Sequence, residues 1–194
     1  MILPAAPLDP GRSAATALLL ARALAASAQA QAAPERGVFI TQIADNSRVT
    51  VTQRKFDSVA QIMQNGAGNE ASARQDGDGW TGLVLAQEGD DNSAILLQRD
   101  IAGGMKTGAA VQQTGNGNQL ELVQDGSDNQ AELSQVGEDN TKTATQMGDG
   151  NRLLWAQNGD GLSDLQIQQT GNAALQITQN AAGAQFAPPP GTGG

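Results

Sequence analysis

The strongest constraint on the fold of this chain is a glutamine that recurs about every eleven residues. Eight of the twelve intervals between successive positions are eleven residues, and three others differ by one. The remaining interval, from Gln98 to Gln113, is fifteen residues. A unit of fixed length indicates a repeat architecture, so the period has to be explained before any single element. The thirteen positions are Gln42, Gln53, Gln64, Gln75, Gln87, Gln98, Gln113, Gln124, Gln135, Gln146, Gln157, Gln169 and Gln179.

Apolar residues occupy the fourth and second positions before each glutamine from Gln53 onward. Val49 and Val51 precede Gln53, and only Lys142 among the twenty-four such positions is not apolar. The residues between them vary and are mostly polar. Alternation of this kind is typical of a strand with one buried face, and a helix of period 3.6 does not produce it. Each unit is therefore predicted to be a strand of six or seven residues and a turn of four or five.

Glycine stands two residues after most of these glutamines, in the predicted turn. Turns often need a positive φ, which glycine adopts without the steric cost of a Cβ. Asp and Asn residues around the glycine can bond their own backbone and favour the bend. The predicted turn glycines are Gly66, Gly77, Gly89, Gly115, Gly126, Gly137, Gly148, Gly159 and Gly171.

Two units make one coil of about 22 residues, and alternate strands then stack in register as two facing sheets. The predicted fold is an all-β, parallel two-sheet β-solenoid with a cross-β arrangement and about six 22-residue coils. The longer interval contains "DIAGGMK", residues 100–106, whose two glycines suit a loop outside the coil.

The repeated amides are predicted to form ladders inside the solenoid. An unpaired buried amide costs roughly 1–3 kcal/mol, and an identical amide one coil away can satisfy it. The ladder would also fix the register of the strands. A catalytic role for these residues has no support in the sequence. The asparagines of the predicted ladder are Asn69, Asn92, Asn118, Asn129, Asn140 and Asn151.

Composition removes most enzyme classes and cofactors. The chain has no Cys and no His, which excludes disulfides, Cys/His zinc sites, a Cys nucleophile and a His-based triad. Its formal charge of −9 disfavours nucleic acid as a partner. The acidic residues lie mostly beside glycine, as Asp90 and Asp125 do, and are interpreted as solvated turn residues. We predict no enzyme activity, no cofactor and no metal site.

The two termini are expected to lie outside the solenoid. Arg12, the apolar run 14–26 and Ala28-Gln29-Ala30 resemble a signal peptide with its cleavage site, so residues 1–30 are expected to direct export. Residues 31–37 are a linker, 38–184 the repeats and 185–194 a disordered Pro/Gly tail. No other stretch is long and apolar enough to span a membrane as a helix.

The repeats resemble those of the curlin family, which forms curli fibres on Gram-negative bacteria. The resemblance covers residues 38–184 and implies a fibre subunit exported unfolded through an outer-membrane secretion pore. It implies polymerisation into extracellular functional amyloid for biofilm, adhesion and surface colonisation, with a major or nucleating curli subunit as partner. The segment that matches the curlin pattern at every defined position is Ser58-x5-Gln64-x-Gly66-x-x-Asn69-x-Ala71-x3-Gln75.

Residue chemistry alone supports the same mechanism, because a solenoid without end caps exposes unpaired strand edges at both ends. The first coil, with Val49 and Val51, can stack on the last, with Leu165 and Ile167. Head-to-tail contact without closure gives a filament. Lys142 lies in an inward position, so its strand is expected to fray or its stem to snorkel to water.

Other solenoid functions remain as alternatives. A soluble acidic solenoid could bind calcium or a surface ligand, but the calcium-binding nonapeptide repeat has a nine-residue step and a G-G-x-G-x-D core that is absent here. Ice binding needs a threonine array on every coil, whereas Thr141, Thr143 and Thr145 lie on one strand only. A carbohydrate-processing solenoid needs a cluster of charged residues in a groove, and Lys142 and Arg152 are interpreted as surface or edge charges.

Overall fold

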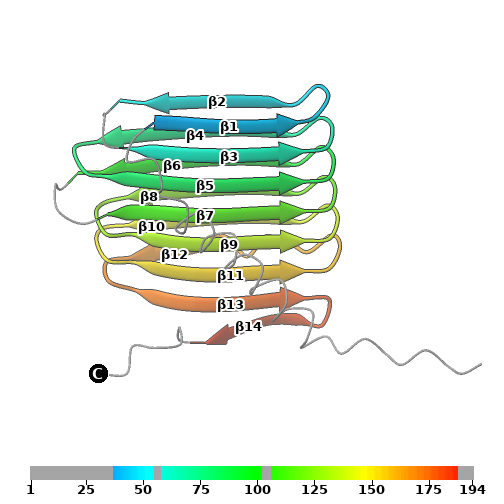
Figure 1. The fold of residues 1–194 in the computed structure, drawn as a ribbon. Helices are drawn as coiled ribbons and strands as arrows, with labels where there is room; N and C mark the ends of the chain where they lie inside the picture. Colours follow the sequence, from blue (N-terminus) through cyan, green and yellow to red (C-terminus); the bar gives the residue numbers. More distant parts are fainter. Residues whose placement is uncertain (1–36, 55–57, 102–105, 188–194) are drawn as a thin grey trace, which may run out of the picture.

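A computed structural model describes residues 37–54, 58–101 and 106–187. Within these ranges the secondary structure consists of β-strands, without a helix. The fourteen strands stack along one axis (Figure 1). The predicted fold, an all-β parallel solenoid of about six coils, is confirmed. The strands are β1 (Gly37–Ile43), β2 (Arg48–Gln53), β3 (Val59–Asn65), β4 (Glu70–Gly77), β5 (Thr81–Glu88), β6 (Ser93–Asp100), β7 (Thr107–Thr114), β8 (Gln119–Asp125), β9 (Gln130–Val136), β10 (Thr141–Met147), β11 (Arg152–Asn158), β12 (Ile167–Thr170), β13 (Ala174–Asn180) and β14 (Gly183–Ala187).

Successive strands alternate between two sheets. One sheet has the order β1-β3-β5-β7-β9-β11-β13-β14, and the other has the order β12-β10-β8-β6-β4-β2. All pairs are parallel except β13 with β14. Each glutamine of the repeat faces the glutamine one coil away, as Gln64 faces Gln87. The fifteen-residue interval leaves this register unchanged, because Gln87 still faces Gln113.

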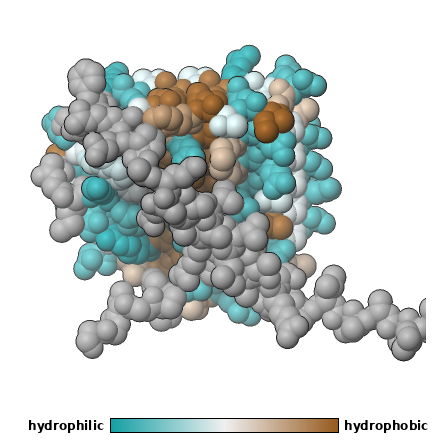
Figure 2. Space-filling view, in the orientation of Figure 1, coloured by the Kyte–Doolittle hydropathy of each residue, from teal (hydrophilic) through white to brown (hydrophobic). Residues whose placement is uncertain are grey.

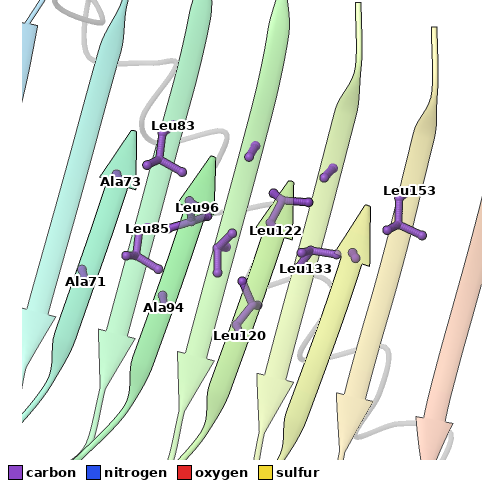
Figure 3. Close-up of a cluster of buried hydrophobic side chains, with 14 of the residues drawn as sticks. Ala71, Ala73, Leu83, Leu85, Ala94, Leu96, Leu120, Leu122, Leu133 and Leu153 are labelled. Carbon is purple, nitrogen blue, oxygen red and sulfur yellow. The ribbon is translucent and has the colours of Figure 1, made fainter. Parts of the chain in front are cut away.

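The core lies between the two sheets and consists of the predicted inward positions. Eighteen of the twenty-four are buried apolar residues, and five more are partly buried against them. Figure 3 shows side chains from strands of both sheets, such as Leu85 and Leu122, in the space between the sheets. Small residues such as Ala71 and Ala73 share this space with leucines. The five partly buried residues all belong to the end coils: Val49, Val51, Leu165, Ile167 and Leu175.

The C-terminal end of the stack differs from the prediction. Residues 183–187 form β14, which runs antiparallel to β13, so ordered structure continues past the predicted boundary at residue 184. Gly183, with φ 126°, and Asn180 close a two-residue loop, and the Asn180 Oδ1 accepts the N–H of Ala182 at 2.9 Å. The edge of β13, which was predicted to be open, is therefore covered by the chain itself.

The strand β12 has only four residues, although its unit was predicted to contain six or seven. The interval from Gln157 to Gln169 is twelve residues, one more than the usual step. Gln166 adopts φ 50° just before β12, and the Asp164 Oδ1 accepts the N–H groups of Thr143 and Gln166, both at 2.9 Å. The additional residue is accommodated by this local bend, which shortens the strand.

The predicted signal peptide, residues 1–30, and most of the predicted tail lie outside the described residues. Within the described ranges, no helix long and apolar enough to cross a membrane is present.

Candidate functional site: stacked amides and the end coils

The repeated glutamines form two continuous hydrogen-bonded ladders along the solenoid. Each Nε2 donates to the Oε1 of the glutamine one coil closer to the C-terminus, over 2.6 Å from Gln42 to Gln64 and 3.0 Å from Gln135 to Gln157. Eleven such bonds join the thirteen side chains. One ladder contains Gln42, Gln64, Gln87, Gln113, Gln135, Gln157 and Gln179, and the other contains Gln53, Gln75, Gln98, Gln124, Gln146 and Gln169.

The same amides also connect one sheet to the other. The Nε2 of Gln113, in β7, donates to the carbonyl oxygens of Ser93 and Asn118 at 3.0 and 3.1 Å. Ser93 is the first residue of β6 and Asn118 directly precedes β8, and both strands belong to the opposite sheet. A buried amide therefore has its donors and its acceptor satisfied, which removes the penalty of burying it. The ladder holds the register along the axis and the distance between the sheets.

The asparagines form a second kind of ladder at the corners. The Nδ2 of Asn118 donates to the Oδ1 of Asn92 at 3.1 Å and to the carbonyl oxygen of Gly137 at 2.8 Å. Its Oδ1 accepts the backbone N–H of Asn140 at 3.2 Å. The column at this corner contains Asn69, Asn92, Asn118 and Asn140, and the opposite corner contains Asn129 and Asn151.

Two buried threonines continue the second corner column and were missed by the sequence reasoning. Thr81 donates through Oγ1 to the Ser58 Oγ at 2.9 Å, and Thr107 donates to the carbonyl oxygen of Gly126 at 3.1 Å. Both stand two residues before the first inward apolar position, which is the offset that Asn69 has in its own unit. That offset was the signal that could have identified them.

The turn glycines all have positive φ, and the space beside them differs along the stack. At Gly137 a Cβ would lie 2.1 Å from the carbonyl oxygen of Gly159, in the next coil. At Gly171 a Cβ would meet nothing within 4 Å. The corners from Gly66 to Gly137 therefore need glycine both for conformation and for close stacking, whereas those at Gly148, Gly159 and Gly171 need it for conformation alone.

Several acidic turn residues cap backbone groups of the preceding coil, which the interpretation as solvated residues did not anticipate. The Oδ1 of Asp90 accepts the N–H of Ala67 at 2.7 Å, and the Oδ1 of Asp160 accepts that of Glu138 at 2.9 Å. Asp149 does the same for Ser127 at the other corner, at 2.8 Å. Each of these acids directly follows a turn glycine, and this recurring pair was the available signal.

Exposed ion pairs cover parts of the outer surface. The Oδ2 of Asp76 lies 2.9 Å from Arg74 and 3.6 Å from Arg54. The hydrogen bond from Arg74, with one from the Gly77 N–H, lowers the pKa of Asp76. Arg152, interpreted from sequence as a surface or edge charge, contacts both carboxylate oxygens of Asp128 at 3.0 Å. Such exposed pairs contribute little to stability.

Lys142 corrects a prediction, because its strand is complete and its side chain is buried. Its Nζ donates to the carbonyl oxygens of Ser134 and Trp155 at 2.9 and 2.8 Å, and lies 4.7 Å from the Trp155 ring centroid. These acceptors and the aromatic face replace water, so neither fraying nor snorkelling occurs. Desolvation lowers the pKa of Lys142 well below its usual value, and the charge of Asp164 opposes this shift only in part.

The N-terminal coil exposes groups that interior coils bury. Val38 and Ile40 are 40% and 46% exposed, whereas Ala60 and Ile62, their register partners in β3, are fully buried. Figure 2 shows this apolar surface at the end of the stack that carries β1 and β2. Among the described residues, the Oε1 atoms of Gln42 and Gln53 accept no hydrogen bond, although their Nε2 atoms donate.

In the described part of the chain, no three Asp or Glu residues gather into a group that could hold a metal ion.

A comparison with known protein families gives a match in the central part of these ladders. Residues 115–148 match the sequence model of the curlin associated repeat. Residues 115–148 therefore contain a curlin associated repeat. The matched segment contains β8, β9 and β10, and the same register and amide stacking continue on both sides of it. No curated protein and no solved structure matches the chain.

Proposed function

We propose that this chain is a secreted structural subunit that assembles head to tail into curli-like extracellular amyloid fibres. The observation that carries the proposal is the unfinished state of the N-terminal coil. Among the described residues, nothing donates to the Oε1 atoms of Gln42 and Gln53 there, and Val38 and Ile40 are exposed at positions that another coil would cover. Each added coil would bury aliphatic groups, at about 0.8 kcal/mol per CH₂, and would complete a row of backbone hydrogen bonds.

The ladder residues act in this proposal as the device that sets the register between copies. A strand shifted by one residue would turn its apolar side chains outward and remove the amides from their partners. The contact between copies would then repeat the contact between coils. The proposed role is structural and involves no catalytic residue and no cofactor.

The proposed location is the cell surface, after export through the periplasm. Residues 1–30 would be the signal peptide, 31–37 a linker and 38 to about 187 the assembling solenoid. The match to the curlin associated repeat supports a curli-type secretion pore and a second curli subunit as partners, with biofilm matrix, adhesion and surface colonisation as the biological outcome.

Assembly is tested by diluting the purified chain from denaturant and following thioflavin fluorescence, with electron microscopy at the plateau. We expect unbranched fibres whose fragments abolish the lag phase of a fresh sample. A chain that stays monomeric and gains no fluorescence, even after seeding, would refute the proposal.

A further inference from the structure

We infer that copies of this chain stack with a half-turn between them, through the β1/β2 end of one copy and the β12/β13 end of the next, once β14 has left β13. The inference rests on the proposed function and specifies its docking surface. It follows from the number of parallel strands in the described part of the chain: seven in the sheet of β1 and six in the sheet of β2, thirteen in all.

With an odd number of parallel strands, the first strand, β1, and the last, β13, lie in the same sheet. The chain passes from β12 in one sheet to β13 in the other, so the next vacant place lies beside β12. An incoming β1 fills that place only if the second copy is rotated by about half a turn. Its β2 then lies beside β13. Without rotation, β1 would lie beside β13, and the sheet of β12 would lack one strand at the junction.

The side chains at the two ends match in the rotated arrangement. Gln169 and Gln179 accept from the preceding glutamines of their ladders but donate to no further glutamine. Among the described residues, nothing donates to the Oε1 atoms of Gln42 and Gln53. With Gln42 of the second copy beside Gln169, the inward Ile40 falls beside Ile167. With Gln53 beside Gln179, Val51 falls beside Ile177. Both ladders and both apolar columns then continue across the junction.

The strand β14 occupies the place that the β2 of an incoming copy needs. It pairs with β13 from Gln176 to Asn180, and Ala184 lies opposite Gln179, where the ladder would require an amide. The Gln179 Nε2 bonds the Ser163 carbonyl oxygen at 2.7 Å, as interior glutamines bond the opposite sheet, but it donates to no further glutamine. Phe186, opposite the buried Ile177, is 59% exposed, so it closes the end poorly. The hairpin is therefore a cap that can be displaced, and it limits addition at this end.

Two cysteine pairs test the rotation, and the natural chain contains no cysteine that would interfere. In the half-turn register, the outward Thr41 of one copy lies beside Gln168 of the next. In the unrotated register it lies beside Thr178. Neighbouring strands are about 4.8 Å apart, a distance that a disulfide can bridge. We therefore compare fibres of the full chain carrying T41C/Q168C with fibres carrying T41C/T178C, after mild oxidation.

A third pair tests the cap. T178C/Q185C joins two outward residues that face each other between β13 and β14, so its disulfide locks the hairpin within one chain. We expect loss of fibre growth for the oxidised chain and recovery after reduction, and an earlier onset of growth for a chain that ends at Asn180. The reduced double variant is the matched control for the substitutions themselves.

The outcomes separate the inference from the proposed function. Covalent multimers from T41C/Q168C fibres, with none from T41C/T178C, are the expected result. Fibres that are linked through positions 41 and 178, or that grow equally well with the hairpin locked, would overturn the half-turn junction and leave the proposed function standing. If no variant and no natural chain formed fibres, the proposed function would fail, and this inference with it.

Discussion

The interior coils and the end coils of this solenoid contain the same residue types, but only in the interior are their hydrogen bonds and their burial complete on both sides. In the interior, Gln113 exchanges hydrogen bonds with glutamines on both sides and lies fully buried. At the N-terminal end, Gln42 bonds on one side only and is exposed. At the C-terminal end, β14 covers one of the two sheets. Each repeat is thus stabilised by contacts with its neighbours, and the terminal repeats retain hydrogen-bonding groups and apolar side chains that another coil could cover.

The largest difference in stability should appear between a variant that lacks a ladder amide inside the stack and one that lacks an amide at its end. Gln113→Ala leaves the partners in Gln87, Gln135, Ser93 and Asn118 unsatisfied and opens a cavity, so we expect a loss of about 3 kcal/mol or more. Gln42→Ala removes one exposed bond and should cost less than about 1 kcal/mol. Urea unfolding followed by circular dichroism measures both. Equal losses would show that the ladder is not cooperative along the stack.

The turn glycines provide a second contrast, between a corner covered by another coil and one that is not. Gly137→Ala places a Cβ 2.1 Å from a backbone oxygen and should cost about 3 kcal/mol, the sum of left-handed strain and overpacking. Gly171→Ala meets only the strain, about 1 kcal/mol. Thermal unfolding of the two variants checks this order. A midpoint lowered more by Gly171→Ala would contradict the packing at the corners.

Lys142 is an interior position that buries an amine where the other interior repeats bury apolar side chains. Lys142→Met keeps the length of the side chain and removes the desolvated amine, and we expect stabilisation by roughly 1–3 kcal/mol near neutral pH. Since folding lowers the pKa of Lys142, the unfolded chain binds a proton that the folded chain does not. The natural chain should therefore lose stability as the pH falls from about 10.4, the ordinary lysine pKa, toward the lowered value.

Denaturant unfolding over an alkaline pH series tests this linkage, with Lys142→Met as the comparison. The variant should show a flatter dependence over that range. If the natural chain gained stability as the pH fell there, or if both chains behaved alike, the buried amine would not be the cause.

The smallest contrast concerns the acidic caps of the corners. Asp160→Ala removes the acceptor of the Glu138 N–H and should cost about 1 kcal/mol, while Asp45→Ala, in the first described coil, should cost almost nothing. Hydrogen exchange of the Glu138 amide reports this contact directly. Faster exchange is expected in Asp160→Ala and unchanged exchange in Asp45→Ala. Protection retained in both variants would remove the capping role.

The interior of the fold could be predicted from the sequence because one pattern repeats there without interruption. Period two fixes the buried face of each strand, and the eleven-residue step fixes which strands are neighbours, so β3 to β11 follow directly. The ends could not be predicted in the same way. β14 follows from a local loop at Asn180 and Gly183 rather than from the repeat, and "GAQFA" has no glutamine in phase with the ladder.

Lys142 shows the second limit of sequence reasoning. A lysine in an apolar position indicates a cost, but the carbonyl oxygens of Ser134 and Trp155 that accept its bonds come from the opposite sheet. Their positions depend on packing between the sheets, which the period does not specify. The acidic caps were overlooked for a similar reason, since each of them acts on a different coil.

The most direct test of the central claim, that stacked amide rungs continue from one copy to the next, is an electron cryomicroscopy reconstruction of fibres of the full chain. We predict unbroken rungs about 4.8 Å apart through every junction, with a subunit height of about 31 Å, or six and a half coils at that spacing. Fibres with a gap in the rungs between copies, or a solution of capped single molecules, would contradict the account.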